Sequence, residues 1–340
     1  MAWSKKDRVN AIVNGESADR VPVSAWRHFP GMEETPQDVA RAMSDFQDAY
    51  DWDFMKINPR AVYYHEVWGN EYDYATYKDV LPTLVKKIVN SADDLGKITR
   101  QPGLAPPLAQ QVESVRLLKA RYGDALPLFQ TIFTPIGILL NLCGQRSLGR
   151  YRESPREESI LVQLMGDNKQ AVHRALKAIA ETLADYAQEL VNAGVDGSFY
   201  AALGMAREGY MTLAEWEEFA KPYDLIVLEP LRSKINMLHT CGIYGNPQRF
   251  TDYPVQVLHW AESAPGNPKI VDSRSWLGGI VPMGGVDERL FGTGEVGKIT
   301  EMAKASLAAH AGKPFIMAPE CSLSTKTLDS ELKAFRASVE

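Results

Sequence analysis

Short apolar runs rich in β-branched and aromatic residues alternate along the chain with longer segments that carry apolar residues every three or four positions. This alternation predicts repeated strand–helix units around a parallel sheet. Eight runs have the length and composition of strands, and they cover residues 21–26, 54–58, 126–133, 197–201, 235–241, 255–260, 280–286 and 314–318. Eight such units in succession predict a closed (β/α)8 TIM barrel.

The segments between these runs carry the signals of helices and loops. Residues 167–193 and 294–311 have the spacing of helices that pack one apolar face on a barrel. Thr212 and Glu215 have the spacing of a capping box, which predicts a helix from there towards Ala220. The proline- and glycine-rich stretch 101–107 predicts a loop, because proline removes backbone donors.

The length of 340 residues suits one large barrel, since such barrels often exceed the usual size of a single core. We expect a single barrel domain over residues 1–340, with an N-terminal helical extension and a loop or lid insertion around residues 60–125.

Composition and charge narrow the classes of partner. Hydrophobic residues at 45% and charged residues at 24% are typical of an ordinary globular protein. The net charge of −6, with no long run of Lys and Arg, argues against nucleic acid as a partner. The start of the chain turns polar where a secretory signal needs an apolar stretch, and no run reaches membrane-spanning length. We therefore expect a cytoplasmic protein without a membrane partner.

Polar residues at the ends of the predicted strands are the first candidates for a site, because the loops after barrel strands form one open face. Six of them are expected to bind substrate: Arg27, His28, Asn58, Tyr200, Trp260 and Glu262. Arg27 suits a two-pronged contact to an anion, and a surface salt bridge is the equal alternative. Tyr200 and Trp260 are expected to wall a pocket, or else to pack in the upper layer of the barrel.

One strand end supplies a nitrogen and a sulfur on the same side. His239 and Cys241 are two residues apart, and alternation along a strand points both to one face. Cys321 follows the last predicted strand, and closure of the barrel would bring it close. Three protein ligands with one open position are typical of a catalytic zinc. Glu262 or Glu320 is a candidate for that open position in the resting state.

A simpler interpretation is that these cysteines are small buried hydrophobes. Cys143 fits that interpretation, because it lies in an apolar run, and it is left out of the site. His173 and His259 are expected to be a helix-surface residue and a strand-flank residue respectively.

Four motifs carry a resemblance to a known family. They are the run at 20–23, the His-x-Cys-Gly centre at 239–242, and the segments 282–287 and 315–321. Over nearly the whole chain they resemble the uroporphyrinogen decarboxylase superfamily. The His-x-Cys pair with a distant Cys is similar to its corrinoid-dependent branch, which methylates a thiol such as coenzyme M. The resemblance implies a zinc held by His239, Cys241 and Cys321, and a methylated corrinoid, carried by a separate corrinoid-binding protein, as methyl donor or acceptor.

The chain also departs from true uroporphyrinogen decarboxylases. Arg27 matches the first of two expected arginines, but Gly31 stands at the second position. The segment 56–60 lacks the aspartate expected after the second strand, and residues 320–322 read Glu-Cys-Ser where the family has Gly-His-Gly. These departures argue against porphyrinogen decarboxylation.

The leading hypothesis is therefore a zinc-dependent methyl or alkyl transferase acting on a small thiol or a methylated small molecule. Zinc would lower the pKa of the thiol, because the thiolate is the nucleophile. A metal-independent decarboxylase or lyase, in which Arg27 grips the carboxylate, is one alternative. A non-catalytic corrinoid- or tetrapyrrole-binding protein is another. The sequence leaves the direction of transfer, the donor and the oligomeric state open.

Overall fold

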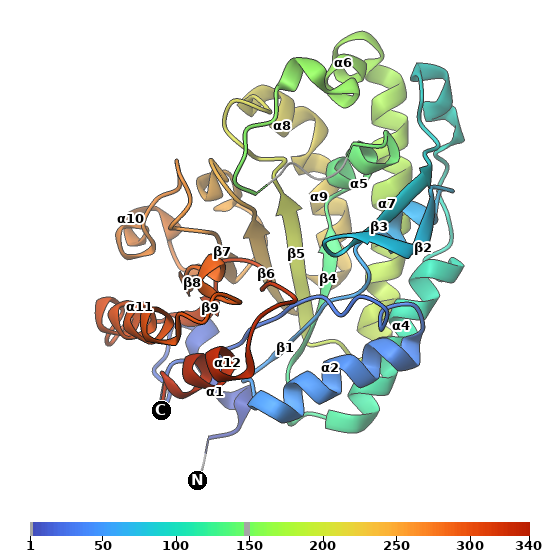
Figure 1. The fold of residues 1–340 in the computed structure, drawn as a ribbon. Coiled ribbons are helices and arrows are strands. Elements are labelled where there is room, and N and C mark those ends of the chain that lie inside the picture. The colour runs from blue at the N-terminus through green and yellow to red at the C-terminus, as the bar shows by residue number, and fades with distance from the viewer. Residues whose placement is uncertain (1–2, 146–149) are drawn as a thin grey trace.

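A curled parallel sheet forms the centre of the computed structural model, which describes residues 3–145 and 150–340 (Figure 1). Seven strands follow one another in the order β1-β4-β5-β6-β7-β8-β9, all in parallel. They are β1 (Met55–Ile57), β4 (Leu128–Phe133), β5 (Gly197–Leu203), β6 (Ile235–Thr240), β7 (Val257–His259), β8 (Val281–Val286) and β9 (Ile316–Pro319). The α/β architecture with a parallel sheet is confirmed.

The first predicted strand, residues 21–26, is not confirmed as a regular strand. This segment is extended and makes isolated parallel bridges, one of them between Val23 and Met317 of β9. On its other side, the backbone N–H of Asp53 donates to the carbonyl of Val23 at 3.0 Å. Pro22 has no N–H to donate to a ladder, which is why regular pairing is interrupted here. The segment therefore lies between the two edge strands, and a closed barrel of eight regular strands is not confirmed.

Helices pack around the curled sheet (Figure 1). They are α1 (Lys5–Val13), α2 (Pro36–Tyr50), α3 (Tyr63–Glu66), α4 (Pro106–Tyr122), α5 (Pro135–Leu142), α6 (Ile160–Asp167), α7 (Lys169–Ala193), α8 (Leu213–Phe219), α9 (Lys221–Leu228), α10 (Arg274–Leu277), α11 (Val296–Ala309) and α12 (Asp329–Ala337). The predicted capping box is present, because Thr212 accepts from the N–H of Glu215 and Glu215 accepts in return. Among the described residues, no helix combines the length and apolar character needed to cross a bilayer.

Helix α1 closes the end of the barrel opposite the strand tips. Its residues Val9 and Ile12 belong to one buried cluster with inward-facing residues of the sheet, such as Phe129, Phe199 and Met237. The arrowheads in Figure 1 point away from α1. A site in the barrel must therefore open at the carboxyl ends of the strands, as the fold class requires.

Residues 60–125, expected as a loop or lid insertion, contain regular structure. Strands β2 (Glu71–Lys78) and β3 (Leu81–Lys86) form an antiparallel hairpin beside the barrel mouth (Figure 1). The predicted loop at 101–107 is corrected at its end, because Pro106 and Pro107 begin helix α4. Proline is favoured in the first turn of a helix, where its missing N–H has no intrahelical partner.

Candidate functional site

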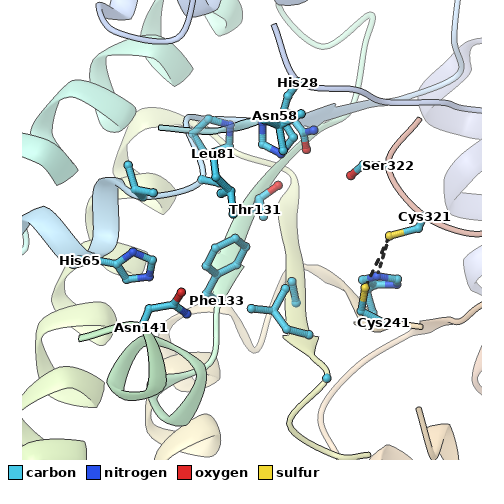
Figure 2. Close-up of a pocket in the computed structure, with 18 of the residues that line it drawn as sticks. His28, Asn58, His65, Leu81, Thr131, Phe133, Asn141, Cys241, Cys321 and Ser322 are labelled. Atoms are coloured by element: carbon cyan, nitrogen blue, oxygen red, sulfur yellow. Dashed lines mark hydrogen bonds between the residues drawn. The ribbon is translucent and has the colours of Figure 1, made fainter. Parts of the chain in front are cut away.

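The structure brings His239, Cys241 and Cys321 together at the barrel mouth. His239 lies in β6 and Cys241 follows its last residue, so both side chains point to the same face. Cys321 lies just beyond β9, and the curl of the sheet carries it across the two intervening strands. Its Sγ is 3.7 Å from Sγ of Cys241 and 3.5 Å from Nε2 of His239 (Figure 2). All three side chains are buried.

These distances fit the donor set of a tetrahedral zinc. Zinc–sulfur bonds of about 2.3 Å and zinc–nitrogen bonds of about 2.0 Å require roughly 3.8 Å between two sulfurs and 3.5 Å between sulfur and nitrogen. The observed separations of 3.7 and 3.5 Å match those edges. The ligand atoms of His239, Cys241 and Cys321 all lie within 4.8 Å of one another. The three residues can hold one zinc and leave its fourth position open.

The two thiols differ in how readily they lose a proton. The hydrogen bond from Cys241 lowers the pKa of Cys321, and the charges of Arg150 and His239 lower it further. The same contact, together with burial, raises the pKa of Cys241. Arg150 also donates to the carbonyl of Ser322 at 2.9 Å, which holds its guanidinium beside the cluster. The cluster is therefore suited to hold negative charge on sulfur.

A cavity of ≈ 170 Å³ opens in front of the cluster. An engineered cavity of about 150 Å³ is enough for benzene, so this one can hold a small ring-sized molecule. Charged and metal-ligating groups line part of it, and they are His28, Lys56, Arg150, His239, Cys241 and Cys321. Apolar side chains line much of the rest, and they include Val62, Leu81, Pro82, Leu84 and Phe133. The hairpin β2–β3 thus forms part of the cavity wall (Figure 2).

Of the predicted substrate-binding residues, His28 and Asn58 line this cavity. Arg27 does not. Its guanidinium lies 5.2 Å from the ring centre of Phe29 and 5.6 Å from that of Phe46, which places it in an aromatic cluster under α2.

Tyr200 and Trp260 also lie outside the cavity, and the expectation that they wall it is corrected. Both are buried on the outer face of the sheet. The hydroxyl of Tyr200 donates to Asp224 of α9 at 2.7 Å, and Nε1 of Trp260 donates to the carbonyl of Pro268 at 2.9 Å. Their neighbour Phe199 faces the barrel interior, because successive side chains in a strand alternate between faces.

The two carboxylates considered for the open zinc position are engaged elsewhere. Glu262 accepts the backbone N–H of Ile270 at 2.8 Å. Glu320 accepts from the hydroxyl of Ser263 at 2.8 Å, and burial raises its pKa to about 8. Its oxygens lie within 4.8 Å of those of the pair Asp287–Glu288, in a separate acidic group.

Lys56 is a cavity residue that sequence reasoning missed. Its side chain is buried, its Nζ donates to Oδ1 of Asn58, and it lies 4.6 Å from the ring centre of Phe199. Burial lowers the pKa of Lys56 to about 7, although the charge of Cys321 opposes the shift. Lys56 of β1 precedes Asn58, the residue after the strand, by two positions, so strand alternation already placed it on the face assigned to Asn58.

His259 was expected at a strand flank, and the structure places it inside the barrel. It is buried, and its ring lies 4.7 Å from that of His239, centre to centre. Its Nε2 donates to the carbonyl of Pro319 at 2.9 Å, which orients the ring. His173, by contrast, is a half-buried residue of α7 as expected, and Cys143 is buried at the end of α5, outside the cluster.

Comparisons with known proteins agree with this architecture. The family model described as uroporphyrinogen decarboxylase (URO-D) matches residues 4–340. A structure described as a methyltransferase from Methanosarcina mazei is 18% identical, with a TM-score of 0.75 over 99% of this chain and 98% of that one. A B12-independent methionine synthase from Shewanella sp. W3-18-1 is 14% identical, with a TM-score of 0.61 over 94% and 96%. A comparison with curated protein sequences gave no match. The match over almost the full length shows that the chain belongs to the uroporphyrinogen decarboxylase family.

Proposed function

We propose that this protein is a zinc-dependent methyl or alkyl transferase whose acceptor is a small thiol. The observation that carries the proposal is the spacing of the ligand atoms. Sγ of Cys321 lies 3.7 Å from Sγ of Cys241 and 3.5 Å from Nε2 of His239, and both separations match edges of a zinc tetrahedron. The cluster faces a cavity rather than the protein core, so the fourth position is open to a substrate. The similar fold of a methyltransferase and of a methionine synthase supports transfer chemistry of this kind.

In this proposal the metal cluster activates the thiol, and the other cavity residues surround it. Zinc bound here would lower the pKa of an incoming thiol and keep its sulfur nucleophilic. Two thiolates and a neutral imidazole cancel the charge of a dication, so an added thiolate retains its negative charge and its reactivity. Lys56 and Asn58 present N–H groups to the cavity beside the cluster. Phe133 and Leu81 add apolar surface to the cavity wall, which helps to keep water from a reactive sulfur.

The methyl donor in this proposal is a methylated corrinoid presented by a separate corrinoid-binding protein. This part rests on the resemblance of the His-x-Cys pair and the distant Cys to thiol-methylating corrinoid enzymes. The acceptor sulfur forms a bond to the methyl carbon, and the electron pair of the old bond stays with the donor.

The decarboxylase alternative receives no support from a particular contact. It needs Arg27 to grip a substrate carboxylate, and Arg27 lies in the aromatic cluster with Phe29 and Phe46 instead. A non-catalytic binding protein would use the same cavity but would not need a metal. The spacing of the thiols and the imidazole suits a zinc, so it gives no reason to prefer this alternative.

Metal analysis tests the proposal directly. The protein is purified without added metal or an affinity tag, and its zinc is measured by plasma mass spectrometry. We expect about one zinc per chain in the parent and almost none in a Cys241→Ser, Cys321→Ser double variant. Cys143→Ser is the matched control, because Cys143 is also buried but lies outside the cluster, and it should keep the zinc. Absence of zinc from the parent, even after reduction and addition of zinc, would overturn the proposal.

With zinc present, methylcobalamin and a panel of small thiols are supplied to parent and variants. We expect thioether formation in the parent and in Cys143→Ser, and none above background in the double variant. Equal turnover by the double variant would show that the cluster does not activate the thiol.

A further inference from the structure

The cavity has a second polar region, on the side away from the thiol cluster. We call it the distal wall, and it consists of His65 of α3, Tyr72 of β2 and Asn141 of α5. Figure 2 shows His65 and Asn141 across the cavity from Cys241 and Cys321. Neither the metal cluster nor the proposed thiol chemistry uses these side chains.

His65 is a buried histidine with one nitrogen free of any partner among the described residues. The residue is only 2% exposed, and its Nδ1 lies 3.1 Å from the hydroxyl of Tyr72. Its Nε2 has no hydrogen-bond partner there. Burial lowers the pKa of His65 to about 3, so the imidazole is neutral at physiological pH. A buried polar atom without a partner is costly and is a place where a ligand can bind.

The neighbouring contacts indicate which nitrogen carries the proton. The backbone N–H of Ile88 donates to Oδ1 of Asn70, which fixes the orientation of that amide. The amide N–H of Asn70 then donates to the Tyr72 hydroxyl at 3.3 Å. A hydroxyl that accepts from Asn70 can donate its own proton to Nδ1 of His65. The imidazole proton then lies on Nε2, and the distal wall offers a neutral donor.

Asn141 adds an acceptor to the same wall. Its Nδ2 donates to the carbonyl of Gly137 one helical turn earlier, at 2.7 Å. This bond uses one of the two N–H groups of the amide, and no donor to the amide oxygen of this cavity-lining residue is recorded among the described residues. The wall therefore combines one donor and one acceptor, and none of its groups carries a charge.

We propose that the distal wall recognises an uncharged oxygen function, such as a phenolic, ether or carbonyl oxygen, at the far end of a largely apolar substrate. The apolar residues Val62, Phe133 and Leu203 line the space between the two ends and suit the body of such a molecule. His65, Tyr72 and Asn141 supply only neutral hydrogen-bonding groups, which match an uncharged oxygen function. This inference rests on the proposed function only in that the other end of the substrate reaches the thiol cluster.

Simple aromatic probes test the wall without knowledge of the natural substrate. Dissociation constants of phenol and toluene are measured by NMR titration. We expect phenol to bind the parent about tenfold more tightly than toluene, because it gains hydrogen bonds at the wall. His65→Phe should remove the preference for phenol over toluene. Equal binding of phenol and toluene to the parent would overturn the proposal.

Two further variants separate recognition from folding. His65→Gln keeps an N–H donor at the end of the side chain and should retain part of the preference for phenol. His310→Phe is the matched control, because His310 is also buried with an unpartnered Nδ1 but stacks on Phe315 outside the cavity. It should bind the probes as the parent does. If His310→Phe and His65→Phe lose the preference equally, the wall is not the cause.

The same titrations in the Cys241→Ser, Cys321→Ser variant distinguish this inference from the proposed function. None of the groups on the distal wall is a metal ligand, so the preference for phenol should persist without the cluster. Persistence with no zinc in the parent would leave the distal wall supported and the transferase proposal rejected. Loss of the preference in this variant would reject the distal wall as an independent subsite.

Discussion

Lys56 is an amine buried in the cavity wall, with no carboxylate recorded in contact with it among the described residues. Its hydrogen-bond acceptor is the side chain of Asn58, and aromatic rings lie beside it. Burial lowers the pKa of Lys56 from 10.5 to about 7. The unfolded chain therefore holds a proton between pH 7 and 10.5 that the folded chain does not. Stability must rise with pH across this window because of this group.

Replacement of this amine by an apolar side chain should remove that dependence. We expect Lys56→Met to be more stable than the parent at pH 7, with an advantage that shrinks by about 2 kcal/mol between pH 7 and pH 9. Urea unfolding at pH 7, 8 and 9 measures the difference. Lys177→Met, on an exposed position of α7, is the control and should show no such trend. Parallel stability curves for Lys56→Met and the parent would contradict the assignment of a neutral amine.

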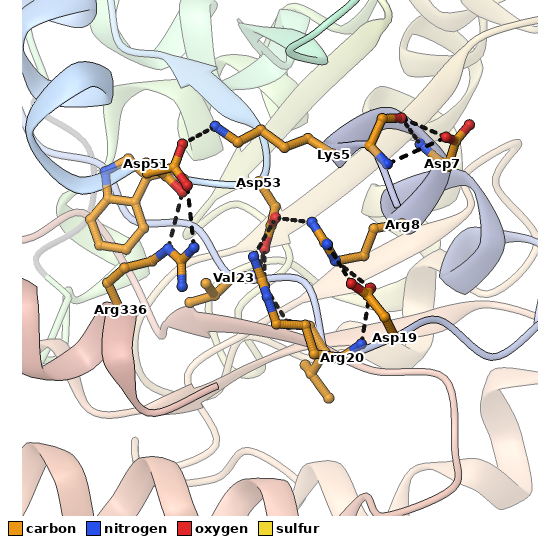
Figure 3. A network of polar contacts seen from close by, with 12 residues as sticks. Lys5, Asp7, Arg8, Asp19, Arg20, Val23, Asp51, Asp53 and Arg336 are labelled. Carbon is orange, nitrogen blue, oxygen red and sulfur yellow. Dashed lines mark hydrogen bonds and ion pairs between the residues drawn. The ribbon is translucent and has the colours of Figure 1, made fainter. Parts of the chain in front are cut away.

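At the scale of elements, a buried carboxylate ties α1 and the extended segment 21–27 to the start of β1. Asp53 is fully buried and accepts from Arg8 at 2.7 Å, from Arg20 at 2.6 Å and from the backbone N–H of Val23 at 2.8 Å (Figure 3). Arg8 belongs to α1 and also pairs with Asp19. The network lies at the end of the barrel away from the site, where a role in stability is expected.

Removal of the charge at Asp53 should therefore destabilise the fold far more than removal of the charge at Asp19, which pairs with the same arginine. Asp53→Asn leaves two guanidinium groups beside a neutral amide, and we expect a loss of about 3 to 5 kcal/mol in the free energy of unfolding. Asp19→Asn is the matched change at a side chain that is 37% exposed, with an expected loss of about 1 kcal/mol or less. Urea unfolding of both variants tests this. Similar losses would show that burial of Asp53 does not set the cost.

Also at the scale of elements, sequence patterns predicted the strands better than they predicted the direction of each side chain. Seven of the eight expected runs form strands, because period and composition mark a buried strand well. The face of the sheet to which each side chain points is harder to predict, because a shift of one position in the assignment reverses the face. Tyr200 was assigned to the pocket, whereas its neighbours Phe199 and Ala201 face inward. His239 and Cys241 were correctly placed together, because residues two apart share a face of the strand whichever face points inward.

At the scale of the whole molecule, contacts between distant segments decide the rest of the site. The hairpin β2–β3 carries polar and apolar residues without a clear alternation, so its strands were missed. His65 reached the cavity only through the packing of α3 against α4 and α5, which no local pattern encodes. Cys321 could be placed by topology alone, because the curl of the parallel sheet brings the end of β9 near that of β6.

A metal at this cluster would join two strands that are not neighbours in the sheet, and so would act on the stability of the whole barrel. His239 and Cys241 belong to the end of β6 and Cys321 to the end of β9, with β7 and β8 between them. A ligand that binds only the folded state stabilises it by mass action, by about 2.7 kcal/mol at one hundred times its dissociation constant. For a chain of this length, that corresponds to a rise of roughly 4 °C in Tm.

Removal of metal by a chelator should therefore lower the Tm of the parent by several degrees, and addition of zinc should restore it. Cys143→Ser should respond as the parent does, because its cluster is intact. The Cys241→Ser, Cys321→Ser variant should show a low Tm that neither chelator nor zinc changes. Differential scanning calorimetry measures all three. A chelator effect of equal size in the double variant would mean that the metal stabilises the barrel from another site, and the link between β6 and β9 would have to be abandoned.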